Sequence, residues 1–322
     1  MKNKCPLISV VMLNYNGLNY LKKTIKPILN LEYHNYEFII VDNGSTDGSI
    51  EYIKKFKKIK LIKSPRLREK NFACNYAIKR AKGKYILLLD NDALLNDIKI
   101  IKNLLNLYSN KIGAISLSFF DVGKLKSSNY GGYFNNYTYI KKNKAVQLKS
   151  LSDFNNCQVG FPQGFAIFIS RNNWLKIGGY DDHLIFGGDD SDLGIKLWLY
   201  GYENILYSKT AQTHLGLPKN KTNVQYQLRL KETFYAHLYT IVKNYSFVNM
   251  LITLFFYSIF SFIKSVKQAI QRNHLPTFFA FFQGYYLFLI NLPIAFKKRK
   301  EIQSKRVIKE DIFLKIRPLR LD

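Results

Sequence analysis

The chain is poor in cysteine and in acidic residues. Its three cysteines, at positions 5, 74 and 157, form no CxxC pair. The sequence therefore offers neither a disulfide framework nor a cysteine zinc site, and it favours a reducing compartment. Basic residues number 49 against 22 acidic ones, which leaves a net charge of +27. Such an excess indicates an anionic partner, whether nucleic acid, acidic lipid or a phosphorylated substrate.

Two further patterns are missing. The first residues, MKNKCPLISVVMLNYN, lack a small-residue cleavage site and an apolar run long enough for a signal peptide, so we expect a first β-strand there. A recognition helix and an RNP-type aromatic pattern are also missing, and lysines are spread along the whole chain. These absences argue against nucleic acid as the partner.

Apolar residues make up 47% of the 322 residues, enough for one large domain or a domain with an appendage. Short apolar runs alternate with segments whose apolar residues have helical spacing. Strands are predicted at 8–13, 36–42, 59–64 and 84–90, and helices at 18–29, 49–58 and 71–83. This alternation predicts an α/β fold with a mostly parallel central sheet flanked by helices on both faces.

Polar residues follow three of these strands. They are Asn14, Tyr15 and Asn16; Asp42 and Asn43; and Asp90, Asn91 and Asp92. Ligands of such sheets bind outside the carboxyl ends of the strands. The three clusters therefore predict a ligand site at one sheet edge, although turns also favour Asp and Asn.

The rest of the chain differs in character. Residues 111–160 are rich in Asn, Ser, Tyr and Gly, and we expect irregular strands and loops there, over an acceptor site. Segments 246–263 and 275–296 are apolar and aromatic. They suit helices that span a membrane, helices that lie in its interface, or a buried pair in a soluble domain. The basic stretch that follows suits anionic headgroups on the cytoplasmic face. We expect a domain at 1–220 and a membrane-associating helical region at 221–322.

Four stretches together carry a family resemblance: ISVVMLNYN, FIIVDNGSTDGS, AKGKYILLLDND and GGYDDHLIFGGDDSDLGIKLWLYGY. Over residues 6–216 the chain resembles family 2 glycosyltransferases with the GT-A fold, and rhamnosyltransferase-like members in particular. The resemblance implies an inverting enzyme of cell-surface polysaccharide synthesis. It would move a sugar from a dTDP- or UDP-sugar, dTDP-rhamnose among them, to a glycan or lipid-linked saccharide.

The resemblance also implies a divalent metal ion. Asp90, Asn91 and Asp92 are similar to the family's DXD motif, in which carboxylates hold Mg²⁺ or Mn²⁺ against the donor diphosphate. Asp92 is expected on the metal and Asp90 on the ribose or the metal, with His214 as a further ligand. The alternatives are a helix N-cap for the aspartates and a surface-loop role for His214.

Donor contacts follow in the same way. The resemblance places Asp42 on the base of the nucleotide, whereas shaping the turn is its alternative role. The segment before the third helix, REKNFACNYA, departs from the family's Gly-rich approach. The predicted donor-binding residues are Asn14, Tyr15, Asn16, Asp42, Asn43, Lys70, Asn71, Asp90 and Asn91.

Asp189 and Asp190 match the family's Glu-Asp motif, with Asp in place of the usual Glu. Inverting transfer needs one base for the acceptor hydroxyl, and the resemblance assigns it to Asp190. Asp189 and Trp198 are expected at the acceptor site, although Trp198 also suits the core and Asp189 or Asp192 a helix cap. A catalytically silent sugar-nucleotide or lipid-binding scaffold and a polyprenyl-phosphate sugar synthase remain alternatives.

Overall fold

The computed structural model describes residues 5–124, 131–135, 139–142, 153–185, 187–216 and 222–317. Part of the predicted irregular segment 111–160 therefore lies outside the described residues. The strands are β1 Ile8–Asn14, β2 Tyr36–Asp42, β3 Ile59–Lys63, β4 Tyr85–Asp90, β5 Ala93–Leu94, β6 Ile112–Asp121, β7 Gly132–Asn135, β8 Tyr139–Lys142, β9 Ala166–Ser170 and β10 Glu203–His214. The helices are α1 Leu18–Leu29, α2 Ser49–Ile53, α3 Lys70–Arg80, α4 Ile100–Leu107, α5 Arg171–Lys176, α6 Asp189–Leu199, α7 Asn223–Asn244, α8 Phe247–Gln271 and α9 Pro276–Lys305.

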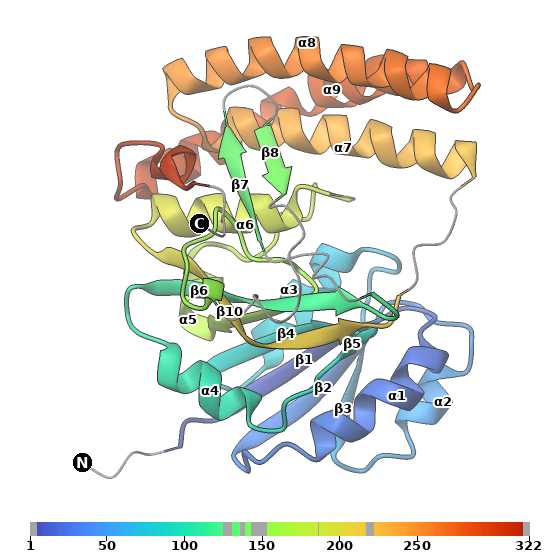
Figure 1. The fold of residues 1–322 in the computed structure, drawn as a ribbon, viewed down its shortest axis with the longest axis vertical. Helices are drawn as coiled ribbons and strands as arrows, with labels where there is room; N and C mark the ends of the chain where they lie inside the picture. The colour runs from blue at the N-terminus through green and yellow to red at the C-terminus, as the bar shows by residue number, and fades with distance from the viewer. Residues whose placement is uncertain are drawn as a thin grey trace.

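One eight-stranded sheet forms the base of the molecule, in the order β3-β2-β1-β4-β9-β6-β10-β5 (Figure 1). The first four strands of this order run parallel, as do β6 and β10, whereas β9 and β5 pair antiparallel with their neighbours. The predicted fold is confirmed: the sheet is mixed but mostly parallel. Its carboxyl edge collects the ends of β1, β2 and β4.

The stretch expected to be irregular begins with a ten-residue strand, β6, which lies inside the sheet. The sequence pattern did not indicate strand β6, because its serines interrupt the run of apolar residues. Ser116 and Ser118 are both fully buried, and the Ser116 hydroxyl accepts a hydrogen bond from the Gln163 backbone N–H. A small polar side chain with a hydrogen-bond partner is tolerated inside a sheet. The serines therefore do not prevent this segment from forming a buried strand.

A layer of three long helices, α7, α8 and α9, covers the side of the molecule away from most of the sheet (Figure 1). Helix α7 begins at a capping box, in which Thr222 and Gln225 satisfy each other's backbone N–H groups. One continuous hydrophobic core runs from Val11 and Ile167 in the sheet to Phe234 on α7 and Phe288 on α9. The helical layer is therefore packed on the α/β body rather than tethered to it.

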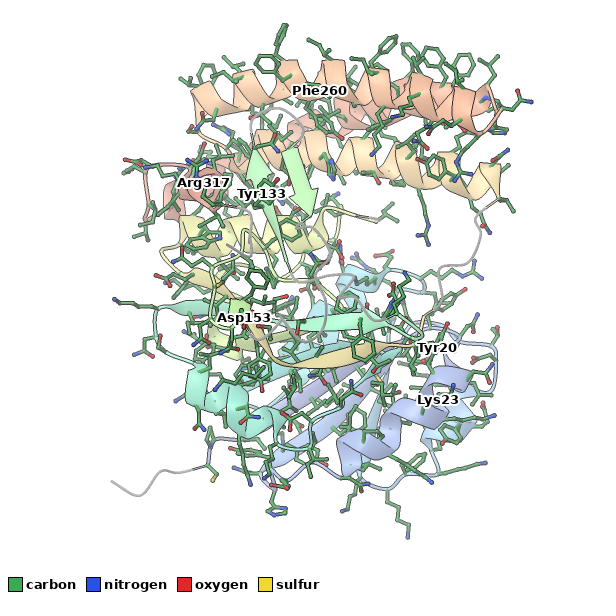
Figure 2. The ribbon with its side chains drawn as sticks, viewed as in Figure 1. Tyr20, Lys23, Tyr133, Asp153, Phe260 and Arg317 are labelled. Carbon is green, nitrogen blue, oxygen red and sulfur yellow. The ribbon has the colours of Figure 1, made fainter. Side chains whose placement is uncertain are left out.

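Two helices among the described residues, α8 and α9, are long and apolar enough to cross a membrane. In each helix, only 22% of the most apolar 18-residue stretch is buried in the protein. Their side chains crowd the outer surface of the layer in Figure 2.

Candidate active site

Strand register sets the carboxyl edge of the sheet. Asn14 at the end of β1 lies beside Asp42 of β2, and its neighbour Leu13 lies beside Asp90 of β4. The buried Asn14 amide donates to Asp42 Oδ2 at 2.9 Å and accepts from the Asn91 amide at 2.9 Å. Asn14, which belongs to the first predicted polar cluster, is thus hydrogen-bonded to a residue of each of the other two.

Asp42 stabilises the turn after β2. Its Oδ1 accepts hydrogen bonds from the backbone N–H groups of Gly44 and Ser45, at 3.1 and 3.0 Å. The side chain is only 2% exposed. These contacts fulfil the turn-shaping role, and the contact with a nucleotide base stays a prediction.

The outer rim of this edge carries Tyr15, which is 39% exposed. The guanidinium of Arg68 lies over its ring, 5.9 Å from the centroid. Asn16 is exposed beside it, and its Oδ1 accepts from the Thr46 backbone N–H at 2.8 Å. An open aromatic ring with a cation above it suits a base and a diphosphate.

Helix α3 contributes its first two residues to the site. The Lys70 ammonium lies 3.1 Å from Asp189 Oδ2. Asn71 is buried, and its amide donates to the backbone carbonyl oxygens of Asp181 and Leu184. Asn71 therefore fixes the loop that leads into α6, while Lys70 is partly buried beside Asp189.

Asp190 sits in the first turn of α6 and is half-buried. Its Oδ2 accepts a 2.8 Å hydrogen bond from the backbone N–H of Gly164, and the Tyr180 hydroxyl lies 3.3 Å from Oδ1. Gly164 precedes β9, which pairs with β4 next to Asp90. Two segments distant in sequence thus bring Asp190 to the carboxyl edge of the sheet.

Asp90, Asp190 and Lys70 lie close enough to shift one another's pKa values. Burial and the neighbouring Asp189 carboxylate raise the pKa of Asp190 to about 7, against the opposing effect of Lys70. Burial also raises the pKa of Asp90 to about 6, although Lys70 again acts in the opposite direction. The Lys70 ammonium, despite burial, is held charged by Asp189 and Asp90, which raise its pKa. A carboxylate that titrates near neutrality is suited to general-base work.

Asp192 has a different place. It is fully buried and pairs with Lys196 at 3.1 Å and with Lys243 of α7 at 2.7 Å. Lys243 also pairs with Asp181, which contacts Lys298 of α9. This buried ion network joins α6, α7 and α9 beneath the site.

Trp198 lies on α6 as well, but it points into the core. It is 4% exposed, and its indole N–H donates to the carbonyl oxygens of Val159 and Gly160. The structure therefore places Trp198 in the core position that was its alternative.

His214 ends β10 between two carboxylates. Pairing of β10 with β5 sets it opposite Ala93, and pairing with β6 sets it opposite Asp121. Its Nε2 lies 3.1 Å from Asp92 Oδ2, and its Nδ1 lies 2.8 Å from Asp121 Oδ1. Hydrogen bonds to Asp92 and Asp121 raise the pKa of His214 to about 9. Sequence reasoning missed Asp121, because it ends the strand that was not recognised.

These groups fit a divalent cation. The part of the chain that the structure describes holds no cluster of three His, Cys, Asp or Glu side chains for a metal. Asp92 nevertheless offers a carboxylate oxygen, and His214 an imidazole nitrogen, at the same place. Asp121 contacts the other ring nitrogen of His214, and an imidazole that binds a metal usually has such a carboxylate partner. A Cβ at Gly216 would lie 2.4 Å from Asp92 Oδ2, so glycine keeps this space open. Mg²⁺ or Mn²⁺ takes most of its remaining ligands from phosphate and water.

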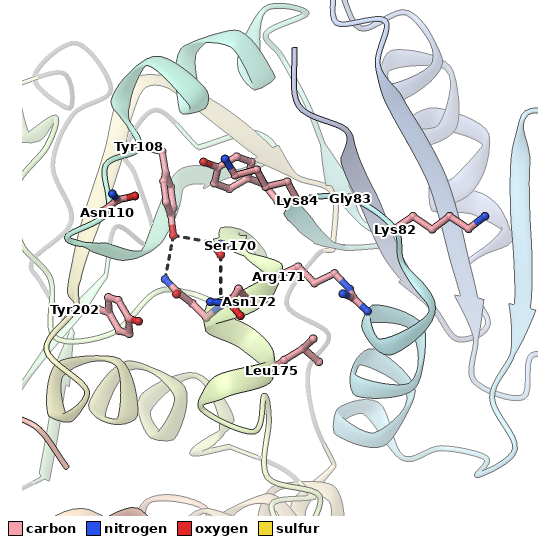
Figure 3. Close-up of a pocket in the computed structure, with 12 residues that line it drawn as sticks. Lys82, Gly83, Lys84, Tyr108, Asn110, Ser170, Arg171, Asn172, Leu175 and Tyr202 are labelled. Carbon is pink, nitrogen blue, oxygen red and sulfur yellow. Dashed lines mark hydrogen bonds between the residues drawn. The ribbon is translucent and has the colours of Figure 1, made fainter. Parts of the chain in front are cut away.

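A separate pocket of about 540 Å³ appears in Figure 3. Lys84, Tyr108 and Arg171 are among its lining residues. Because Tyr85 begins β4 and Asp90 ends it, this pocket lies at the opposite edge of the sheet from the carboxylates.

Residues 9–167 match the family model described as glycosyl transferase family 2. Over this region, just under half of its length, the chain is similar to glycosyltransferase family 2, and its mostly parallel sheet with flanking helices is the GT-A fold. The match agrees with the predicted family, whereas the likeness to rhamnosyltransferase-like members stays a prediction.

Two curated relatives are bacterial. An uncharacterized glycosyltransferase of Haemophilus influenzae is 41% identical over 103 residues, which cover 31% of this chain and 41% of that protein. A putative teichuronic acid biosynthesis glycosyltransferase, TuaG of Bacillus subtilis, is 35% identical over 108 residues, which cover 32% of this chain and 43% of that protein. The chain thus spans about two fifths of the length of these relatives.

A solved structure extends the likeness to nearly the whole chain. The mannosyltransferase PcManGT from Pyrobaculum calidifontis, in complex with GDP-Man and Mn²⁺, superposes with a TM-score of 0.58 at 17% identity. The match covers 94% of this chain and 86% of that one. At this identity the likeness concerns the fold.

Proposed function

We propose that the protein is an inverting glycosyltransferase that uses a nucleotide-diphosphate sugar, a dTDP- or UDP-sugar, as donor. The observation that carries the proposal is the convergence of Asp90, Asp189, Asp190 and Lys70 in one cluster at the carboxyl edge of the sheet. Donor-binding enzymes of this architecture use that edge. A putative teichuronic acid biosynthesis relative supports a role in cell-surface polysaccharide synthesis.

Asp190 acts as the general base in this proposal. The Gly164 N–H holds one carboxylate oxygen, which leaves the carboxylate oriented to accept the proton of an acceptor hydroxyl. Loss of that proton allows the oxygen to form a bond to the anomeric carbon while the bond to the diphosphate breaks. No enzyme nucleophile is required for such a single displacement, and the configuration inverts.

The donor side is assigned to the other edge residues. Tyr15 and Arg68 would border the base and the diphosphate, and Lys70 would neutralise part of the phosphate charge. Asp92 and His214 would hold a divalent cation, with Asp90 on the ribose or the cation. The cation would supply Lewis-acid stabilisation of the leaving diphosphate. Asp121 would orient His214.

The acceptor is proposed to be a glycan or lipid-linked saccharide at the cytoplasmic face of the cell membrane. The two apolar helices α8 and α9, together with the basic run 297–300 in the last part of α9, support membrane association. This arrangement suits an acceptor that is carried on a lipid.

The direct test is a panel of sugar nucleotides assayed with Mn²⁺, Mg²⁺ or chelator, with membrane extract as the acceptor source. The proposal expects metal-dependent release of the nucleotide diphosphate from one donor. Silence across the panel with both metals, together with retained nucleotide binding, would favour the sugar-nucleotide-binding scaffold instead. Transfer to polyprenyl phosphate alone would favour the synthase.

A further inference from the structure

Helix α8 carries its apolar side chains on the outside. Four of the six side chains that it buries are small, and three of these, Thr253, Ser261 and Ser265, are 0–2% exposed. The opposite face exposes large apolar groups, with Phe247 and Phe255 both more than 60% exposed. A helix of a water-soluble protein shows the reverse arrangement.

Helix α9 repeats the pattern. It buries Thr277, Ala280 and Gly284 and exposes Phe282 and Tyr286. A Cβ at Gly284 would lie 2.8 Å from the Lys231 carbonyl oxygen of α7, so glycine permits close packing of the two helices. Small residues at helix contacts and large apolar ones on the free side are typical of helices solvated by lipid.

The free faces of α8 and α9 form one surface, which we call the apolar platform. Figure 2 shows its side chains projecting away from the α/β body, Phe260 among them. The platform consists of Phe247, Val248, Leu251, Ile252, Phe255, Ile259, Phe260, Phe262, Ile263, Phe279, Phe282, Tyr286, Leu289, Ile290 and Phe296. A continuous exposed patch of this kind marks an interaction surface.

Charge indicates what covers the platform. Residues 247–300 contain no Asp or Glu. Their charged residues are all basic and lie toward the two ends of the hairpin: Lys264, Lys267 and Arg272 near the turn, and the run 297–300 at the far end. An apolar face bracketed by cations complements a bilayer with anionic headgroups.

Length alone permits α9 either to cross the bilayer or to lie on it. Its 30 residues span about 45 Å, against a hydrocarbon thickness of about 30 Å. The contacts decide between the two. The first third of α9, at Gly284, packs on α7 at Lys231, whose ammonium pairs with Glu232 at 3.2 Å. An upright α9 would carry this charged pair into the hydrocarbon, which is costly.

The far end of α9 is fastened to the body. Arg299 donates to the carbonyl oxygens of Val242 and Tyr245 at the end of α7. Arg306 pairs with Asp311 at 2.8 Å. A reorientation of α9 along the membrane normal would break the bonds of Arg299 to the end of α7.

We propose that α8 and α9 lie flat in one leaflet and seat the protein on an anionic bilayer, with the hairpin turn on the same side as the catalytic domain. The proposal rests on the membrane association of the proposed function and specifies its geometry. It places α7 and the carboxylate cluster in water above the headgroups, where a lipid-linked acceptor presents its sugar.

The side of the turn is measured with single-cysteine variants in cytoplasmic-side-out membrane vesicles of a bacterial host. One variant carries Gln271→Cys in a chain whose three cysteines are replaced, and the control keeps only Cys5, which is exposed on the catalytic domain. A membrane-impermeant maleimide should label both before detergent is added. Labelling of the Gln271→Cys variant only after detergent would show a spanning hairpin and overturn the proposal.

The second measurement is flotation with vesicles of anionic or neutral phospholipid. The double variant Phe255→Asp with Phe282→Asp should reduce the floated fraction about tenfold, whereas Ile98→Asp, at a comparably exposed position away from the platform, should not. Nucleotide release in solution should be equal in all three proteins, which separates this proposal from the catalytic one. Wild-type protein that stays unbound and dimerises through the platform would overturn it in favour of a second copy.

Discussion

Asp92 Oδ2 and His214 Nε2 lie 3.1 Å apart, although one follows β4 and the other ends β10. The short strand β5 explains their proximity, because it turns the chain after Asp92 back against β10. Backbone pairing on both sides of the Asp92 turn thereby fixes the two side chains that we propose as metal ligands. Precise placement of its ligands is what a metal site needs.

Gly216→Ala should weaken metal-dependent activity while the fold is kept. The new Cβ would meet Asp92 Oδ2 at 2.4 Å and His214 Nε2 at 3.0 Å, so both side chains must turn aside. We expect the metal concentration for half-maximal activity to rise roughly tenfold or more. Titration with Mn²⁺ measures it, with Leu215→Ala as the neighbouring control. An unchanged metal requirement in Gly216→Ala would contradict the assigned metal site.

The pH profile should report Asp190. Only its ionised form accepts a proton, so kcat/KM should rise with pH and level off above the Asp190 pKa of about 7. Asp189→Asn removes the charge that raises this pKa, so the acid limb should move to lower pH. Lys70→Met removes a charge that lowers it, so the limb should move to higher pH. If the acid limb of the kcat/KM profile keeps its position in both variants, Asp190 is not the group that titrates.

The buried ion network should appear in stability. Burial opposes ionisation of Asp181, but Lys243 and Lys298 outweigh it and hold its pKa well below the usual range. Asp181→Asn leaves Lys243 partly unpaired and should lower the free energy of unfolding by about 3–5 kcal/mol at pH 7. Glu310→Gln, which removes an exposed pair with Lys315, should have no measurable effect in the same urea titration.

The same network gives a signed pH dependence. A carboxyl group with a depressed folded pKa stabilises the fold above its unfolded pKa of about 3.9 and loses that contribution as the pH falls further. Wild-type protein should therefore lose stability below about pH 4 more steeply than Asp181→Asn. Equal acid sensitivity in the two proteins would show that Asp181 is not the group responsible.

The sequence predicted the first half of the fold well, because strands such as 8–13 and 84–90 are continuous apolar runs that end at Asn14 and Asp90. Strand β6 was not recognised, since Ser116 and Ser118 interrupt its pattern, and Asp121 was missed with it. Small polar residues that are buried in a strand give no signal in hydrophobic periodicity.

The candidate site was predictable only where side chains carry the chemistry. Gly164 acts through its backbone N–H on Asp190, so its residue type gives no indication of the role. Trp198 illustrates a second limit. Nearly all of α6 is buried, so neither face of the helix is marked by polarity, and the direction of the indole needed coordinates.

The central claim is that Asp190 takes the acceptor proton, and Asp190→Asn tests it most directly. The amide is nearly isosteric with the carboxylate but cannot act as a base. Donor binding, measured by calorimetry with the nucleotide diphosphate and Mn²⁺, should be unchanged, while kcat should fall by roughly 10²- to 10⁴-fold. Wild-type turnover in Asp190→Asn, with the donor bound as tightly as before, would contradict the account.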